Sequence, residues 1–411
     1  MHSFILRLVS AVLLAGLAVS APAQPQPKKK RNADGRIDLE SEMPADARKL
    51  RLGDSAPDFR LKGVDGRMMS LADFKQAKAL MVVFLSNHCP YSHAAETRLI
   101  PLAKELADKG LAVVSINPNN PEGVDLNELG YSKYNDSYDE MILYAKEQGF
   151  PFPYLYDGDE QKTARAYGCL ATPHVFIFDQ ERKLRYVGRV DDSRFADPAT
   201  VKSADARNAV LEILAGKPVT VATTPVVGCS TKWKENKVEL AKADERWASA
   251  PVTLETIDAA GVTKLAANPT NKLRLINVWA TWCAPCVAEF PEFVGLARRM
   301  NNRDFEFISL SMDDPKMEPQ VKKFLEKQHV ATPNRVARSL TAEGRKTNNY
   351  LYNEASTDAL IKALDPQWPG PLPHTVLIAP GGKIIYRRNG TIDPQELKEK
   401  VVEALGAYYQ P

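Results

Sequence analysis

Short apolar runs alternate with amphipathic stretches along most of the chain, and this pattern predicts strands that alternate with helices. The runs at 80–85 and 273–279 are rich in large and β-branched apolar residues, as buried central strands are. Each run is soon followed by a cysteine, Cys89 or Cys283, and then by a helical pattern. We therefore expect an α/β fold, a mixed sheet with helices on both faces.

The same order of elements occurs twice. In each half a second apolar run follows the helix, at 111–116 and 305–310. Later a proline opens a further strand, which a turn connects to another strand, and a helix closes the half, at 201–215 and 394–405. These prolines are Pro173 and Pro373, and each follows its cysteine at a similar distance. Because two such coincidences are improbable by chance, we infer an internal duplication with two domains in tandem.

The expected organisation has five segments. They are a signal peptide at 1–23, a flexible leader at 24–47, a first domain at 48–232, a linker at 233–250 and a second domain at 251–411.

The signal peptide is predicted from the first residues of the sequence. Arg7 precedes an apolar stretch at 9–21, and Ala21 and Ala23 fit the small-x-small cleavage rule. An uncleaved membrane anchor is the alternative, but the stretch is short for a spanning helix, which needs ~20 residues. We expect an exported protein, in the periplasm or another extracytoplasmic space, without a membrane span after cleavage.

Composition excludes some classes. The 411 residues carry 54 Lys and Arg against 51 Asp and Glu, a net charge of +3 that is too balanced for an electrostatic nucleic-acid binder. Five cysteines are too few for a disulfide scaffold, and their odd number leaves at least one without a partner within the chain.

The second half contains the most informative motif, Trp282-Cys283-Ala284-Pro285-Cys286. A strand that runs into a helix places Cys283 at the helix N-terminus, where unpaired N–H groups stabilise a thiolate. Cys286 lies one turn along the same face, within reach of a disulfide with Cys283. Half of a zinc site and a purely structural disulfide are the alternatives, but no second cysteine or histidine pair stands at zinc-ligand spacing.

These residues carry a resemblance. The run from Trp279 to Pro291, with Leu372-Pro373 much later, resembles the thioredoxin superfamily and within it the exported TlpA/ResA-like thiol-disulfide oxidoreductases. The resemblance covers about 250–408 and implies a thioredoxin-like fold. It also implies that Cys283 attacks a partner disulfide and that Cys286 resolves the mixed disulfide.

The same resemblance assigns the neighbouring residues. It implies that Pro373 is a cis proline beside the sulfurs and that Leu372 offers backbone hydrogen bonds to a bound peptide. Glu289, one turn beyond Cys286, corresponds to an active-site acid, with a solvated helix residue as the alternative. We expect Trp282 to shield the sulfurs and to contact partners, or else simply to pack.

The first half, with Asn87-His88-Cys89-Pro90-Tyr91, resembles a redoxin family of the AhpC/TSA type. Position 92 is serine, so the partner of Cys89 is not one turn away. We favour Cys169, four residues before Pro173, as the resolving cysteine. Cys229 is the second candidate, and a centre without a resolving partner is the third. A small buried residue is the alternative for Cys169.

Thr172 and Pro173 correspond to the Leu372-Pro373 step, so we include them among the site residues of the first half.

Two other functions remain open for the first half. A peroxiredoxin-like thiol peroxidase, an antioxidant activity, fits Ser86 three residues before Cys89, but position 82 is valine where that pattern has proline. A copper-binding or non-catalytic redox module would use His88, Cys89 and His93, because imidazole and thiolate are apt ligands.

The interpretation favoured by the sequence is an exported thiol-disulfide oxidoreductase with no cofactor beyond the redox-active Cys283–Cys286 disulfide, and no metal. Its partners are expected to be protein disulfides and a membrane electron donor. We also hypothesise a relay in which Cys283 and Cys286 reduce an oxidised Cys89 centre, because tethering gives a high effective concentration. The sequence leaves open the direction of electron flow, the substrate and the oligomeric state.

Overall fold

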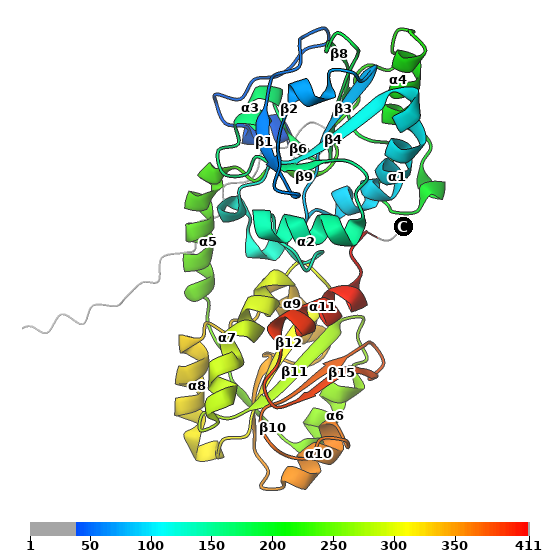
Figure 1. The fold of residues 1–411 in the computed structure, drawn as a ribbon. Helices are drawn as coiled ribbons and strands as arrows, with labels where there is room; N and C mark the ends of the chain where they lie inside the picture. Colours follow the sequence, from blue (N-terminus) through cyan, green and yellow to red (C-terminus); the bar gives the residue numbers. More distant parts are fainter. Residues whose placement is uncertain (1–37, 410–411) are drawn as a thin grey trace, which may run out of the picture. The chain divides into compact units, whose positions relative to one another are not determined.

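The computed structural model describes residues 38–409, so the signal peptide and much of the leader lie outside the described residues. The first domain holds a seven-stranded sheet in the order β2-β1-β5-β4-β3-β7-β8. Its neighbouring strands β3 and β4 run side by side (Figure 1). Its strands are β1 Arg60–Gly63, β2 Met68–Ser70, β3 Ala79–Phe84, β4 Leu111–Asn117, β5 Tyr154–Tyr156, β7 His174–Phe178 and β8 Leu184–Gly188. A separate two-stranded ladder joins β6 Ala171–Thr172 to β9 Cys229–Ser230. The helices are α1 Pro90–Leu106, α2 Tyr138–Gln148, α3 Lys162–Tyr167 and α4 Asp205–Leu214.

The second domain holds a six-stranded sheet in the order β10-β13-β12-β11-β14-β15. Its strands are β10 Glu255–Ile257, β11 Leu273–Trp279, β12 Phe305–Ser311, β13 Asn349–Tyr352, β14 His374–Ile378 and β15 Ile384–Asn389. Its helices are α6 Ala259–Ala267, α7 Ala284–Arg299, α8 Glu318–Lys327, α9 Asn334–Ala342, α10 Thr357–Leu364 and α11 Pro394–Leu405. Short 3-10 turns are η1 Leu39–Glu42, η2 Leu71–Phe74, η3 Ala107–Lys109, η4 Pro121–Gly123, η5 Leu126–Glu128, η6 Pro198–Thr200, η7 Lys234–Asn236 and η8 Pro315–Met317.

Both sheets are mixed. In the first domain β3 pairs in parallel with β4 and antiparallel with β7. In the second domain β11 pairs in parallel with β12 and antiparallel with β14. The expected fold class, two tandem mixed sheets flanked by helices, is confirmed.

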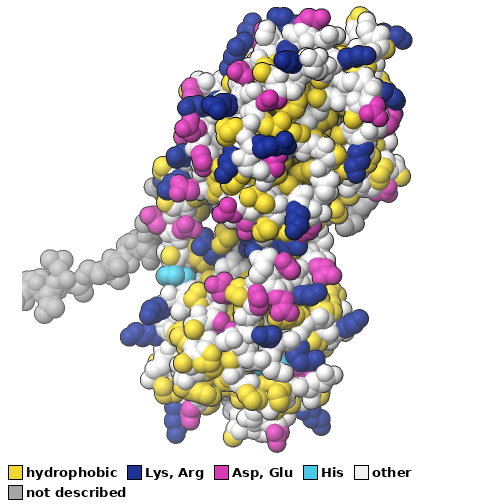
Figure 2. All heavy atoms as spheres, in the orientation of Figure 1, with side chains coloured by type: hydrophobic (Ala, Val, Ile, Leu, Met, Phe, Trp, Pro, Cys, Tyr) yellow, Lys and Arg dark blue, Asp and Glu magenta, His cyan; other side chains and the backbone are white. Residues whose placement is uncertain are grey.

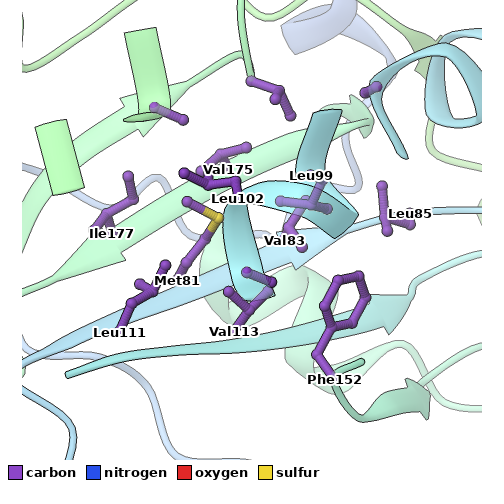
Figure 3. Packing of buried hydrophobic residues seen from close by; sticks show 14 of the residues in the cluster. Met81, Val83, Leu85, Leu99, Leu102, Leu111, Val113, Phe152, Val175 and Ile177 are labelled. Carbon is purple, nitrogen blue, oxygen red and sulfur yellow. The ribbon is translucent and has the colours of Figure 1, made fainter. Parts of the chain in front are cut away.

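The central strand β3 is buried on both faces, which explains its unbroken apolar sequence. Met81 and Val83 point into one core with Leu99 and Leu102 of α1 (Figure 3). Alternate residues of the strand, such as Val82, point into the opposite core. Burying each such side chain contributes about 1.5–3 kcal/mol relative to exposure, so this strand holds the two layers together.

The central strand of the second domain also carries a charge that its apolar pattern did not predict. Arg274 is buried, and its Nε donates to Glu306 Oε1 at 2.6 Å on the neighbouring strand β12. Its Nη2 donates to Glu343 Oε2 at 2.8 Å. A buried charge is tolerated when it is paired and hydrogen-bonded in this way.

The helices after the cysteines begin at Pro90 and Ala284, directly after Cys89 and Cys283, so the expected place of Cys283 at a helix N-terminus is confirmed. Proline is tolerated in a first helical turn, where its missing N–H would have no partner.

The segment expected as linker is largely structured. Lys237–Ala248 forms helix α5. Trp233, expected as the first linker residue, is only 2% exposed and packs in a core of the first domain with Phe176 and Phe178. The large apolar area of tryptophan favours this burial over a place in a solvated connector.

On the face that Figure 2 shows, positive and negative side chains are interspersed, as the balanced composition suggests. No helix within residues 38–409 is long and apolar enough to cross a membrane.

Candidate active sites

The site in the second domain lies where strand β11 ends and helix α7 begins. Cys283 is the N-cap residue of α7, and a disulfide bond joins it to Cys286. The backbone N–H of Cys286 donates to Cys283 Sγ at 3.4 Å. The helix start therefore offers backbone N–H groups to a sulfur charge at Cys283.

The connection before the cysteines is held by hydrogen bonds. Trp279, the last residue of β11, is fully buried, and its Nε1 donates to Ser309 Oγ at 2.8 Å. The backbone N–H and the hydroxyl of Thr281 both donate to the carboxylate of Asp313, at 2.9 and 2.5 Å. Trp282, the next residue along the chain, is 69% exposed. This placement suits contact with a partner, because a large exposed aromatic ring offers much apolar area.

Glu289 lies one turn beyond Cys286 on α7 and is buried. Its Oε2 accepts a hydrogen bond from the backbone N–H of Ile392 at 2.8 Å, and its Oε1 has no partner among the described residues. Burial raises the pKa of Glu289 to about 7, although the Ile392 N–H and the charge on Arg388 oppose that rise. A carboxyl group with this pKa takes up and releases a proton near neutral pH.

The step before strand β14 has the expected form. The Leu372–Pro373 peptide bond is cis, and Leu372 is half-buried against the core that contains both cysteines. In the first domain the corresponding Thr172–Pro173 bond is also cis.

The site in the first domain has its cysteine in the same place but different surroundings. Cys89 is the N-cap of α1 and is fully buried. Its Sγ lies 3.0 Å from the carbonyl oxygen of Thr172 and 2.8 Å from the Sγ of Cys229. Thr172 is fixed in turn, because its Oγ1 lies 2.8 Å from Ser86 Oγ.

A buried ion pair lies beside this sulfur. His88 Nδ1 is 2.5 Å from Asp136 Oδ2, and both side chains are almost fully buried. The carboxylate of Asp136 also accepts hydrogen bonds from the backbone N–H of Asn87 at 2.7 Å and from the amides of Asn117 and Asn119 at 3.1 and 2.9 Å.

This network sets the charge at Cys89. Burial lowers the pKa of His88, but the charge and the hydrogen bond of Asp136 outweigh burial and raise it. Burial raises the pKa of Cys89, but the hydrogen bond from Cys229 and the charge on His88 outweigh burial and lower it. The hydrogen bond with Cys89 raises the pKa of Cys229, and burial adds to that rise. Of the two, Cys89 is the cysteine that these surroundings make easier to ionise.

The structure separates the two cysteines that we considered as partners of Cys89. Cys169, favoured from the sequence, is fully buried in a hydrophobic core, where its Sγ lies 3.4 Å from the carbonyl oxygen of Ala171. Burial raises its pKa. Cys229, the second candidate, is the cysteine that lies against Cys89.

His88 and His93 of the first domain have different hydrogen-bond partners. His93 Nε2 lies 2.7 Å from the carbonyl oxygen of Asn87, whereas His88 faces Asp136. Within residues 38–409 no group of three or more His, Cys, Asp and Glu side chains is arranged to hold a metal ion. The expectation of no metal stays a prediction.

Two acidic residues of the first domain were not recognised from the sequence. Asp136 follows no local motif. Glu96 is buried on α1 two turns after Cys89, and its Oε2 accepts a hydrogen bond from Tyr144 at 2.5 Å. Burial raises the pKa of Glu96 to about 8. A signal for Glu96 does exist, because Glu289 stands at a similar distance from Cys283 on the equivalent helix.

The fold and the placement of the sulfurs define a protein with two thioredoxin-like domains. The AhpC/TSA family matches residues 52–187, and the Redoxin family matches residues 245–405. The chain belongs to this redoxin and AhpC/TSA group of thioredoxin-like proteins, with two such domains in tandem.

Curated relatives match parts of the chain. It is 32% identical over 133 residues to the thioredoxin-like protein YneN of Bacillus subtilis, a match that covers 32% of this chain and 68% of that protein. It is 27% identical over 124 residues to the thiol-disulfide oxidoreductase ResA of Geobacillus thermodenitrificans. That match covers 30% of this chain and 58% of ResA.

Among solved structures, a hypothetical protein from Sinorhizobium meliloti is 37% identical, with 46% of this chain and 97% of that chain covered and a TM-score of 0.41.

Proposed function

We propose that the protein is a thiol-disulfide oxidoreductase whose second domain exchanges disulfides through Cys283 and Cys286. The observation that carries this proposal is the Cys283–Cys286 disulfide at the start of α7, with the buried acid Glu289 one turn further on. A short bridge within one helical turn stabilises a fold little, because the loop that it closes is small.

In the reduced form, the Cys283 thiolate attacks one sulfur of a partner disulfide and releases the other as a thiolate. Cys286 then attacks Cys283 in the mixed disulfide, and the second partner sulfur leaves. The partner gains two electrons and two protons, and the domain returns to the disulfide. Glu289 accepts the proton of Cys286 in this step, and its unpartnered Oε1 is the atom available for it.

The substrates in this proposal are disulfides of other proteins, and the exposed Trp282 ring contacts them beside the sulfurs. A membrane protein that carries dithiol electrons recharges the oxidised domain. The test is reduction of insulin disulfides by the full chain with dithiothreitol as electron source. Activity that requires Cys283 supports the proposal, and its absence contradicts it.

The second part of the proposal concerns the two domains together. Cys283 and Cys286 pass electrons to an oxidised Cys89 centre in the first domain. The double variant C283S/C286S provides the test, with the same reductant supplied. If its first domain is still reduced at the wild-type rate, the relay is wrong.

We also propose export. The support is the apolar stretch at 9–21 and the small residues at Ala21 and Ala23. When the full-length chain is expressed in a bacterium, the mature protein is expected outside the cytoplasm with Gln24 as its first residue. An intact Met1 on the exported protein would contradict cleavage.

The AhpC/TSA match of residues 52–187 favours a second candidate function, a thiol peroxidase at Cys89. The lowered pKa of Cys89 supports it, since the thiolate is the nucleophile. Complete burial of Cys89 opposes it. Rapid consumption of hydrogen peroxide that is lost in C89S would establish this function.

A further inference from the structure

In the first domain, strand β9 pairs with strand β6, which ends at the residue before the cis proline. In the ladder of β6 and β9, Thr172 lies opposite Cys229 and Ala171 lies opposite Ser230, in antiparallel register. Thr172 is the residue directly before Pro173. At the equivalent place in the second domain, Leu372 belongs to no strand and no strand pairs with it within residues 38–409. One copy of the duplicated edge is therefore filled, and the other is open.

An extended edge with unpaired backbone groups is where a peptide adds as a further strand. In the first domain that position is taken by β9, which places Cys229 Sγ 2.8 Å from Cys89 Sγ. Cys229 therefore lies where a cysteine of an added peptide would meet the sulfur of Cys89.

Backbone hydrogen bonds and a buried side chain hold the segment after Cys229 in place. The backbone N–H of Thr231 donates to the carbonyl oxygen of Leu170 at 3.1 Å. The carbonyl oxygen of Lys232 accepts from the backbone N–H of Asn120 at 2.9 Å, and the buried Trp233 follows. β9 is therefore a built part of the domain and not a loosely placed end of the linker.

The residue before Cys229 fits only as glycine. A Cβ atom on Gly228 would lie 2.2 Å from the carbonyl oxygen of Thr172, a backbone atom that cannot move aside without moving the cis-proline step. Gly228 therefore permits the close approach of β9 to this edge.

The two cysteine residues differ in exposure. Cys89 is fully buried, whereas Cys229 is partly exposed. A thiol from outside therefore reaches Cys229 first.

We propose that Cys229 is a built-in disulfide partner of Cys89, and that external thiols open the Cys89–Cys229 disulfide by attack on Cys229. The incoming thiolate bonds to Cys229 Sγ, the Cys89–Cys229 bond breaks, and Cys89 leaves as a thiolate. A second thiol of the reductant then attacks the mixed disulfide and releases Cys229, so that the pair has gained two electrons. This inference deepens the proposed function, because it assigns the sulfurs of the first-domain centre.

The choice of leaving group agrees with the surroundings. In thiol–disulfide exchange the thiol of lower pKa leaves faster. The buried His88–Asp136 pair and the start of α1 favour the thiolate at Cys89. Oxidation runs in reverse: a disulfide such as oxidised glutathione forms a mixed disulfide with Cys229, and Cys89 displaces the glutathione thiolate.

The test uses the full chain with C283S and C286S also present, so that its outcome does not depend on the second domain or on the relay. After oxidation with oxidised glutathione, non-reducing peptide mapping is expected to find Cys89 joined to Cys229 and Cys169 free. A Cys89–Cys169 bond, or no bond at Cys89, would overturn the pairing.

The point of attack is tested in the same background. Protein oxidised to the Cys89–Cys229 disulfide receives glutathione and is quenched early with an alkylating reagent, before a second thiol resolves the mixed disulfide. Peptide mapping is expected to find glutathione on Cys229 and the alkyl group on Cys89, because Cys89 is the better leaving group. Glutathione on Cys89, or equal amounts on the two cysteines, would overturn attack at Cys229.

A glycine substitution tests the role of β9 without changing either sulfur. G228A is expected to lower the yield of the Cys89–Cys229 disulfide, since the added Cβ forces β9 away from Thr172. G295A is the matched control, because nothing lies within 4 Å of a Cβ at that helical position. An undiminished yield in G228A would contradict the requirement for this strand.

Discussion

The two domains place a cysteine at the same point of the same fold and then obtain its partner sulfur in different ways. In the second domain Cys286 lies one turn along the helix that Cys283 begins. In the first domain Ser92 occupies that helical position, and the nearby sulfur comes from Cys229 on a distant strand. One centre is encoded within four residues, and the other exists only once the chain has folded.

The surroundings of the sulfurs differ as well. The first-domain sulfur lies beside the buried His88–Asp136 pair. In the second domain the exposed Trp282 directly precedes the two cysteines along the chain, and Glu289, a buried acid of raised pKa, follows them. Under the proposed function, the second domain meets protein partners and moves a proton, whereas the surroundings of Cys89 in the first domain favour a negative sulfur.

The largest effect is expected from removing the helical dithiol. C283S should reduce insulin-disulfide reduction to background, because the attacking thiolate is lost. C169A is the matched control and should keep the activity, since Cys169 is buried in a hydrophobic core of the first domain. Loss of activity in C169A with retention in C283S would reverse our assignment.

The next effect concerns the buried pair of the first domain. D136N removes the charge that raises the pKa of His88, so a positive neighbour of the Cys89 thiolate is lost. A rise of one unit in the pKa of Cys89 reduces the thiolate fraction about tenfold at a pH below that pKa. Ultraviolet thiolate absorbance against pH, recorded with C229S in the background, measures the change.

D139N is the control for this variant, because Asp139 is exposed and lies outside the network. An unchanged titration in D136N would show that the pair does not set the charge at Cys89.

A smaller, pH-dependent effect is expected for Glu289. Its pKa of about 7 means that the carboxylate forms as pH rises through neutrality, so resolution by Cys286 should accelerate over that range and then level off. E289Q should lack this inflection while it retains the first attack by Cys283. Rapid-quench measurement of the mixed disulfide against pH separates the two steps, and an unchanged inflection in E289Q would contradict the role.

The raised pKa of Glu289 should also affect how the unfolding free energy of the protein depends on pH. The folded-state pKa of Glu289 lies above the ordinary value of about 4.3 for an unfolded chain, so the folded protein binds more protons between these values. The unfolding free energy therefore falls as pH rises from about 4.3 towards 7, and E289Q should weaken that fall. Urea unfolding across this range provides the measurement.

The smallest effect is expected from W282A. The ring is exposed, so the unfolding free energy should change by less than about 0.5 kcal/mol. KM for a protein disulfide should rise about threefold with kcat nearly unchanged, since uniform binding is lost. The KM for oxidised glutathione, a small substrate, should stay the same. An equal rise for both substrates would show that the ring does not contact large partners.

The features that the sequence predicts well are those set by residues close together along the chain. The bounds of β11 and α11 match the predicted ranges 273–279 and 394–405, because hydrophobic period and helix start signals are local. The C-x-x-C centre is local for the same reason. The duplication was visible because each half repeats the same local signals.

The first-domain site was harder to predict because its parts meet through tertiary structure. Cys229 is 140 residues from Cys89, and the nearness of Cys169 to Pro173 in sequence favoured Cys169, whereas Cys229 is the cysteine that lies against Cys89. Asp136 carries no local motif and reaches His88 only through folding. Gly228 was a signal in retrospect, since a glycine directly before a cysteine permits close backbone approach.

The relay between the unlike centres is the central claim, and it requires the first-domain disulfide to be the easier of the two to reduce. A Cys89 thiolate stabilises the reduced form of the first-domain centre, and this raises the reduction potential of the Cys89–Cys229 disulfide. The direct measurement gives fully oxidised protein a single equivalent of dithiothreitol, waits for equilibrium, and locates the free thiols by mass spectrometry. We predict new thiols at Cys89 and Cys229, with the Cys283–Cys286 disulfide intact. New thiols at Cys283 and Cys286, with the first domain still oxidised, would contradict the account.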